Sequence, residues 1–117
     1  MNQEFLVIVS DVVWKFHVYD QYGKKRAKAI TALAKRAPGY SIDFYEESFE
    51  LNLKLLQETI KAVCDAPKSP KPNQVYSQYS DVDTDYVLKR LQKIFPNQND
   101  EFITSHLGMS IDWFYLR

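Results

Sequence analysis

Apolar residues recur every three or four positions along the first 37 residues of the chain. Gly23 and Arg26 interrupt this seam, although the stem of an arginine can lie along an apolar surface. The other members of the seam are Phe5, Val9, Val12, Phe16, Tyr19, Ile30, Leu33 and Ala37. Such spacing is typical of an amphipathic helix, and the stretch KKRAKAITALAKRA consists largely of good helix formers. We therefore expect one helix of about 35 residues, with Gly23 as the place where it can bend.

A strand interpretation of residues 5–18 competes with the helix. Phe5, Val7 and Val9 would face one side of a strand, and β-branched valines favour that conformation. Ser10 and Asp11 would then form a two-residue hairpin turn, which normally requires glycine or asparagine. Because the helical seam continues in phase into the next stretch, the helix is favoured. An α+β fold with an N-terminal β-hairpin stays open as the alternative.

A second helix is predicted directly after the dipeptide Pro38-Gly39, which ends the first. Ser41 suits its N-cap. Its apolar seam is continuous: Ile42, Tyr45, Phe49, Leu53, Leu56, Ile60 and Val63. The short turn makes the two helices antiparallel neighbours. Basic residues crowd the end of the first helix and acidic residues crowd the start of the second, so the charges favour the same alignment.

The remainder of the chain predicts shorter helices. Residues 67–80 hold three prolines within six positions and are expected to form an extended linker. Helices are expected at 84–95 and 101–107, with a final turn after Ser110. The residues suited to cap or close them are Asp81 or Asp83, Asn99 or Asp100, and Gly108. The sequence thus predicts an all-α fold of four to five helices, led by a long antiparallel helical hairpin, in a single domain of residues 1–117.

The unequal lengths of the first two helices predict an exposed apolar end. A helix of about 35 residues spans about 52 Å and one of about 25 residues about 37 Å, so the second cannot cover the start of the first. An uncovered apolar surface of this kind marks an interface. We expect the protein to be a protein–protein interaction module. Its partner would be a second copy of the chain, in a homodimer, or else another protein. The candidate contact residues are Phe5, Val9, Val12, Trp14, Trp113, Phe114 and Tyr115.

Charge and cysteine content narrow the setting. The 15 basic and 15 acidic residues cancel, so any charged partner must be held by a local patch. Cys64 is the single cysteine, which excludes an internal disulfide and fits a reducing compartment. The run FLVIVS is far shorter than the roughly 20 residues that span a bilayer. We expect a cytoplasmic protein with no membrane partner.

The chemistry-bearing residues are sparse. The three glycines are scattered rather than grouped in a phosphate-binding loop. The acidic run 81–85 lacks the glycine and glutamate of a calcium loop. His17 and His106 have no neighbouring residues in the sequence that require acid–base chemistry. An enzyme is therefore not favoured, and no catalytic residue, cofactor or metal ligand is predicted.

The C-terminal stretch FITSHLGMSIDWFYLR resembles a helix-turn-helix. Leu107 to Ser110 resembles its turn, and Phe114 fills an apolar slot of the recognition helix. Ile111, Asp112 and Trp113 depart from the pattern, because residues that face bases are usually polar or basic. The resemblance implies an alternative function, a small DNA-associated regulator that uses residues 101–117. Its phosphate contacts would come from the basic block of Lys24, Lys25, Arg26 and Lys28.

Overall fold

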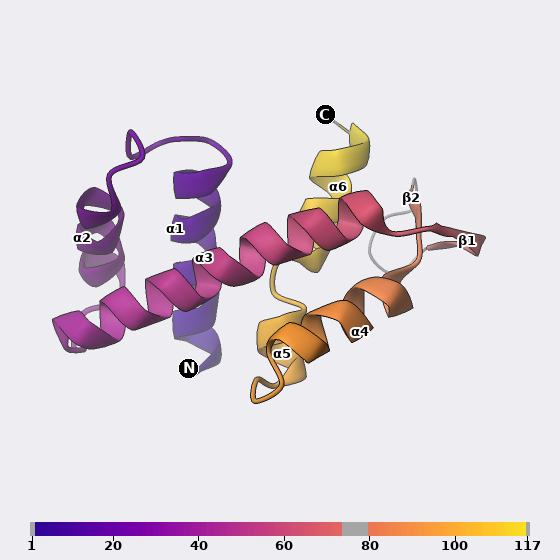
Figure 1. The fold of residues 1–117 in the computed structure, drawn as a ribbon. Helices are drawn as coiled ribbons and strands as arrows, with labels where there is room; N and C mark the ends of the chain where they lie inside the picture. Colours follow the sequence, from indigo (N-terminus) through magenta and orange to yellow (C-terminus); the bar gives the residue numbers. More distant parts are fainter. Residues whose placement is uncertain (1, 74–79, 117) are drawn as a thin grey trace. The chain divides into compact units, whose positions relative to one another are not determined.

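The computed structural model describes residues 2–73 and 80–116, and the fold is all-α, as predicted. Its helices are α1 (Gln3–His17), α2 (Arg26–Arg36), α3 (Ile42–Asp65), α4 (Thr84–Ile94), α5 (Asp100–Ile103) and α6 (Leu107–Leu116) (Figure 1). One short pair of strands, β1 (Lys68–Asn73) and β2 (Ser80–Val82), lies between α3 and α4 in the sequence. The chain divides into two compact units, Met1–Leu56 and Gln57–Arg117, here called the N-terminal and the C-terminal unit. That residues 1–117 act as a single domain stays a prediction.

The N-terminal stretch is helical, so the β-hairpin alternative is wrong. Asn2 caps α1, because its side-chain oxygen accepts a hydrogen bond from the Phe5 N–H at 2.7 Å. Glu4 lies in the first turn, where the helix macrodipole favours negative charge. The buried residues of α1 cover a wide face: Phe5, Leu6, Val9, Val12, Val13, Trp14 and Phe16. A stripe this wide indicates a helix that packs on more than one side.

The first helix is shorter than predicted, because the chain leaves the helical conformation between Val18 and Lys25. Three residues of this turn have left-handed backbone angles, with φ at +53° in Asp20, +59° in Gly23 and +61° in Lys24. A right-handed helix does not contain such residues. The prediction of a single helix of about 35 residues is therefore wrong. The chain instead folds back, and the expected long hairpin is replaced by three helices.

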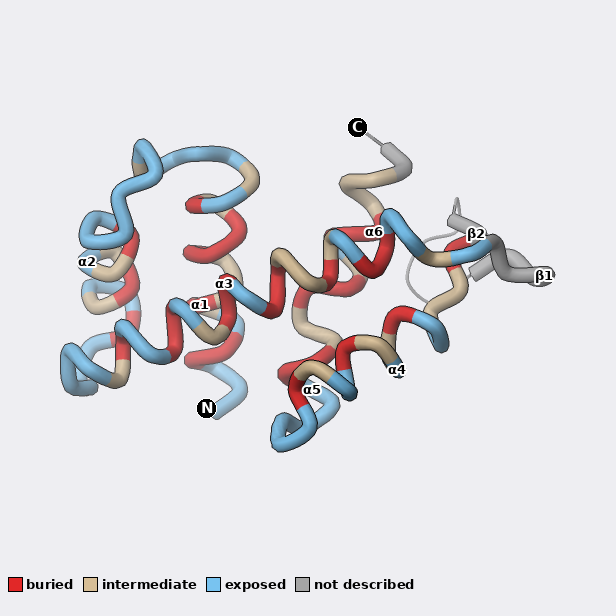
Figure 2. The backbone as a smooth tube through the Cα atoms, viewed as in Figure 1, coloured by how far each residue is buried: buried red, intermediate tan, exposed pale blue. Residues whose placement is uncertain are grey.

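In the N-terminal unit, α2 runs antiparallel to α1 and the first half of α3 crosses both (Figure 1). Arg26, at the start of α2, places its guanidinium 5.8 Å from the centroid of the Phe16 ring, near the end of α1. Arg36, at the end of α2, pairs with Asp11 of α1. Phe16 also meets Phe49 of α3 edge to face, with ring centroids 5.2 Å apart. Figure 2 shows buried positions concentrated on the facing sides of these helices.

The predicted charge pairing between the second and third helices is present in part. Nε of Arg26 lies 2.6 Å from Oε1 of Glu50, as the alignment of basic and acidic blocks suggested. Arg36, in contrast, pairs with α1 rather than α3. Such exposed pairs are worth up to about 1 kcal/mol each, so packing rather than charge holds the three helices together.

In the C-terminal unit, part of the expected linker forms a strand. β1 pairs antiparallel with β2, with Lys68 opposite Val82 and Asn73 opposite Ser80. The stretch is extended, as its prolines predict, but up to Asn73 it is paired with another segment. Residues 74–79 of the expected linker lie outside the described residues.

Three predicted N-caps are confirmed. In each, a side-chain oxygen accepts a hydrogen bond from the backbone N–H three residues later, which satisfies a donor that the first helical turn leaves free. The capping residues are Ser41 for α3, Asp83 for α4 and Asn99 for α5.

The expected role of Gly108 is wrong. α5 ends at Ile103, a turn covers 104–106, and α6 begins at Leu107 and includes Gly108. Residues 107–110 therefore form the first turn of a helix rather than the turn of a helix-turn-helix. α5 has 4 residues, about one helical turn, which is too short for the first helix of that motif.

Candidate functional site

Four of the predicted contact residues are buried in the folded chain. Phe5, Val9, Val12 and Trp14 all belong to the core, with exposed fractions of 3% or less. The prediction that they form a docking surface is wrong, because the fold-back at residues 18–25 lets α2 pack beside α1. A partner therefore cannot reach these side chains while the chain stays folded.

The other predicted contacts lie on α6. Trp113 and Phe114 are half-buried, and the side chain of Tyr115 lies outside the described residues. Met109, which is four residues before Trp113, is exposed. The α6 contacts stay a prediction.

An aromatic cluster lies where α1 and α3 begin. The ring of Tyr40 stacks on that of Phe44, with centroids 4.7 Å apart and planes at 20°. Phe5 lies 5.0 Å from both rings and 6.4 Å from the ring of Tyr45. Aromatic pairs in these tilted and offset arrangements each add about 0.5–1.5 kcal/mol beyond the area that they bury. Three of the rings are buried or half-buried, whereas Tyr40 remains 40% exposed.

Hydrogen bonds hold the exposed ring in place. Nδ2 of Asn2 donates to Oη of Tyr40 at 3.1 Å. The backbone N–H of Tyr40 donates to Oη of Tyr45 at 3.2 Å, and Tyr45 in turn donates to the carbonyl of Ala37 at 2.6 Å. Both the ring and the backbone of Tyr40 are therefore fixed before any partner arrives.

A pocket of about 180 Å³ opens beside Tyr40. Its apolar lining comes from Phe5, Ile8, Ala37 and Pro38, and its polar lining from Asn2, Glu4, Arg36 and Tyr40. Sites for small-molecule ligands usually measure about 300–1,000 Å³. The volume and the mixed lining therefore suit one inserted side chain better than a cofactor or metabolite.

Asp11 fixes the position of the arginine that lines the pocket. Its carboxylate accepts hydrogen bonds from Arg36 and pairs with Lys15 at 3.0 Å. Partial burial acts to raise the pKa of Asp11, but the bonds from Arg36 and Lys15 outweigh it and lower that pKa. The single carboxylate of Asp11 is thus shared between two cations, Arg36 and Lys15. Among the described residues no ion pair involves Glu4, the other charged residue of the pocket.

The basic block of the alternative function lies on the surface. Lys24, Lys25, Arg26 and Lys28 are all exposed, in the turn before α2 and in its first turn. The expectation that acidic residues of the next helix neutralise this block holds for Arg26, through Glu50. Within the described residues the three lysines have no ion pair.

The two histidines form no catalytic pair in the described residues. His106 is buried, and burial lowers its pKa to about 4, so it is neutral at pH 7. Ser110, one helical turn later, is also buried, and among the described atoms its hydroxyl has no hydrogen-bond partner. A nucleophile activated by a histidine requires a hydrogen bond between the two side chains. The described residues likewise contain no group of three or more metal-ligating side chains.

Comparisons with protein-family models, with curated proteins and with solved structures found no match. None of the helices that the structure describes is long and apolar enough to cross a membrane. The function must therefore be argued from the surface itself.

Two exposed residues beside Ser41 are not among the contact residues that the sequence predicts. Tyr40 lies in the short turn between the first two predicted helices, and Ile42 belongs to the apolar seam of the second. The structure exposes both. The available signal was the apolar pair on either side of Ser41, since a cap residue at a helix start leaves its neighbours near the surface.

Proposed function

We propose that the protein is a protein–protein interaction module that forms a homodimer through the surface around Tyr40. The observation that carries the proposal is an exposed tyrosine that is stacked on Phe44, hydrogen-bonded to Asn2 and part of the lining of a pocket. Ile42 adds an exposed aliphatic side chain next to it. The fixed tyrosine, the pocket and the neighbouring Ile42 together distinguish this surface from the scattered exposed apolar residues that any protein carries.

The fixed position of Tyr40 favours binding. Association has to overcome the loss of side-chain freedom, about 0.5–1.5 kcal/mol for each mobile side chain that becomes fixed. The stacking on Phe44 and the hydrogen bond from Asn2 restrict the Tyr40 side chain in the single chain already. Tyrosine and arginine are also enriched among the residues that dominate interface energies, and Arg36 lines the same pocket.

The charges of the pocket favour a second copy of this chain as the partner. A two-fold symmetric interface brings the same patch of both subunits together, so the patch must complement itself. The pocket carries one carboxylate, Glu4, and one guanidinium, Arg36. Across a two-fold axis, Glu4 of each copy can face Arg36 of the other, whose remaining N–H donors are not used by Asp11. A patch with charge of a single sign would repel its own copy.

A cytoplasmic location stays part of this proposal. Cys64 is exposed and free, and an exposed thiol is better preserved in a reducing compartment. A role as a DNA-associated regulator stays a prediction as well, although its turn at residues 107–110 is helical.

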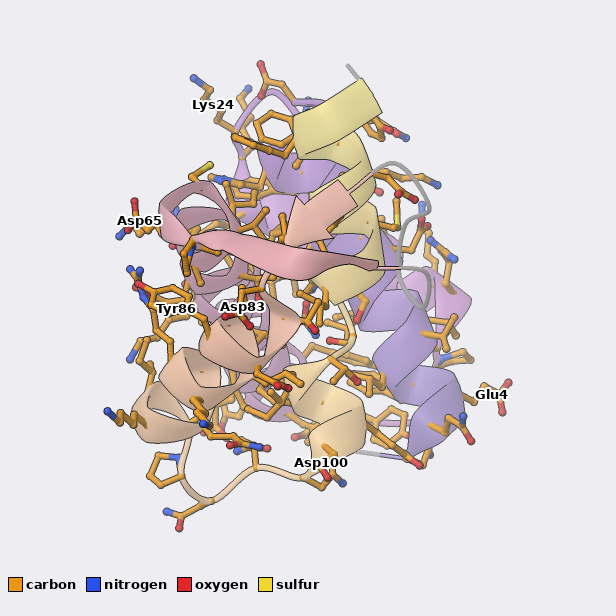
Figure 3. All side chains as sticks on the ribbon, turned by 90° about the vertical axis from the view of Figure 1, so that its right-hand side faces the viewer. Glu4, Lys24, Asp65, Asp83, Tyr86 and Asp100 are labelled. Atoms are coloured by element: carbon orange, nitrogen blue, oxygen red, sulfur yellow. The ribbon has the colours of Figure 1, made fainter. Side chains whose placement is uncertain are left out.

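The experiment is a measurement of molar mass by light scattering across a range of protein concentrations. We expect a dimer with a dissociation constant in the micromolar range, about −8 kcal/mol. Tyr40→Ala should weaken it at least about tenfold, and Ile42→Asp, which alters no buried residue, should do the same. Tyr86→Ala is the matched control, because Tyr86 is 37% exposed and lies on α4 of the C-terminal unit (Figure 3).

Two outcomes would contradict the proposal. A monomeric mass for the wild type at every concentration would exclude the homodimer. An equal loss in Tyr86→Ala and Tyr40→Ala would show that the contact is not at this surface. Circular dichroism melting curves separate a loss of dimer from a loss of fold.

A further inference from the structure

The turn at residues 18–25 and the outer face of α2 form a second surface, distinct from the pocket of Tyr40. Its lysines are Lys24, Lys25, Lys28 and Lys35, all of which are exposed. Lys24 projects from the protein surface in Figure 3. Lys28 and Lys35 are seven residues apart, two helical turns, and therefore lie on one face of α2. We call these four residues the lysine ridge.

The lysine ridge is charged although the chain as a whole is neutral. From residue 21 to residue 42 the sequence contains no aspartate or glutamate. The two arginines of this stretch, Arg26 and Arg36, are balanced by Glu50 and Asp11. In the described part of the chain no ion pair balances the lysine ridge. The nearest acidic residue before the lysine ridge is Asp20. One carboxylate does not neutralise four lysines, so a local positive potential remains.

An exposed aromatic ring lies in the turn that leads to these lysines. Tyr19 is 64% exposed, and its ring meets the buried ring of Trp14 edge to face, with centroids 6.3 Å apart. The contact with a core residue holds the exposed ring in a defined position. Two backbone hydrogen bonds hold the turn between Tyr19 and the first lysines, from the N–H of Gln21 to the carbonyl of Lys15 and from the N–H of Lys25 to the carbonyl of Tyr22.

We propose that the lysine ridge and Tyr19 bind single-stranded nucleic acid. Proteins that bind single strands combine a positive surface that follows the phosphates with aromatic side chains on which bases stack. Lys24, Lys25 and Lys28 would hold phosphates and Tyr19 would stack on a base. The inference does not depend on the homodimer, because Tyr40 lies near the start of α1 and Tyr19 follows its end.

Other polyanions fit this surface less well. A helix that binds an anionic membrane carries its lysines on a polar face and inserts the large apolar side chains of the other face into the lipid. On α2 the large apolar residue Leu33 is buried in the protein, and the exposed positions beside the lysines are Ala27 and Thr31. An acidic protein segment would be attracted by the lysines but would have no use for an exposed ring. Both alternatives become outcomes of the test.

The test measures the fluorescence anisotropy of a labelled single-stranded oligonucleotide of about 12 nucleotides, titrated with the full chain. We expect binding at about 50 mM salt that weakens at least about tenfold at about 200 mM. The double variant Lys24→Glu, Lys28→Glu should raise Kd at least about tenfold and flatten the salt dependence. Tyr19→Ala should raise Kd about fivefold or more with the salt dependence unchanged, whereas Tyr19→Phe should bind like the wild type.

Matched controls come from α4. Lys89 and Lys93 are exposed and four residues apart, like Lys24 and Lys28. The double variant Lys89→Glu, Lys93→Glu changes the net charge by the same amount, and we expect its Kd to stay within about twofold of the wild type. A loss equal to that of the Lys24 and Lys28 variant would show that net charge alone sets binding, and would overturn the proposal.

Further outcomes would also overturn it. They are the absence of oligonucleotide binding at low salt, an unchanged Kd in Tyr19→Ala, and tighter binding of polyglutamate than of the oligonucleotide. A fourth is tighter binding of vesicles made of phosphatidylcholine and phosphatidylserine in equal parts. Melting curves identify variants that lose their fold. The Lys24 and Lys28 variant keeps the test decisive, because both side chains are exposed and neither residue belongs to the core.

Discussion

Tyr45 donates its hydroxyl proton to the backbone carbonyl of Ala37, with 2.6 Å between the two oxygen atoms. This bond joins the first turn of α3 to the C-cap residue of α2. The same hydroxyl accepts the N–H of Tyr40 at 3.2 Å. One buried side chain thus fixes the conformation of residues 37–40, which carry the candidate dimer surface.

Removal of this hydroxyl should therefore destabilise the fold. Tyr45→Phe leaves the Ala37 carbonyl and the Tyr40 N–H without their partner, and we expect a loss of about 1–2 kcal/mol of unfolding free energy. Urea denaturation followed by circular dichroism measures it. Tyr86→Phe is the control, since the hydroxyl of Tyr86 lies on the surface and accepts a hydrogen bond from Arg90 at 3.4 Å. Equal midpoints for both variants would show that the Tyr45 bond is not structural.

Local signals in the sequence predicted much of this fold correctly. Ser41, Asp83 and Asn99 were recognisable as caps because capping depends on the residue type and its distance from the apolar seam. The seam of α3 was equally readable, although Ile42 at its start is exposed. Such features depend on a few neighbouring residues and need no knowledge of the rest of the chain.

The turn after α1 was not predictable in the same way. Gly23 signalled a bend, but Asp20 and Lys24 also adopt left-handed angles, and only glycine adopts such angles without a steric cost. Once the chain folds back there, apolar residues that appear to form an uncovered end become core. The exposure of Tyr40 depends on the rings of Phe5 and Phe44 and therefore on tertiary packing, which no local pattern encodes.

Two neighbouring valines on α1 test whether its apolar face is core or interface. Val9 is fully buried, whereas Val7 is 64% exposed. Val9→Asp places an unpaired carboxylate in the core and should cost about 4 kcal/mol or more, enough to unfold a marginally stable domain. Val7→Asp should change stability by less than about 0.5 kcal/mol. Thermal melts compare the two. Equal and small effects would restore the interpretation of this face as a docking surface.

Burial of His106 should make the stability fall in mild acid. Burial lowers its pKa from 6.5 to about 4, so the native state disfavours the proton that the unfolded chain accepts. Stability is then complete above pH 6.5 and declines until the pH reaches about 4, a total loss of about 3 kcal/mol. Urea midpoints across that pH range measure the decline.

Variants of each histidine separate their contributions. The pKa of His17 is also lowered by burial, so His17→Gln removes any share that it contributes to the same decline. The effect of Asp11 lies at lower pH, because its lowered pKa stabilises the fold above the ordinary carboxyl value of 3.8. That stabilisation is lost as the pH falls below 3.8 and through the lowered pKa. A nuclear magnetic resonance titration of His106 with a midpoint near 6.5 would contradict the argument.

The left-handed residues of the turn give a final pair of opposite predictions. Gly23 has a φ of +59° with open space around its α-carbon, so Gly23→Ala should cost about 1 kcal/mol from backbone conformation alone. Lys24 has a similar left-handed conformation, with a φ of +61°, and its side chain makes that conformation unfavourable. Lys24→Gly should therefore stabilise the fold by about 0.5–1 kcal/mol. Lys24→Gly also removes one charge of the lysine ridge, and should weaken oligonucleotide binding while raising the melting temperature. A variant that is more stable and binds less well would show that the chain retains a strained lysine at this position for its side chain. A lower melting temperature for Lys24→Gly would instead show that the left-handed angle at this residue is not a source of strain.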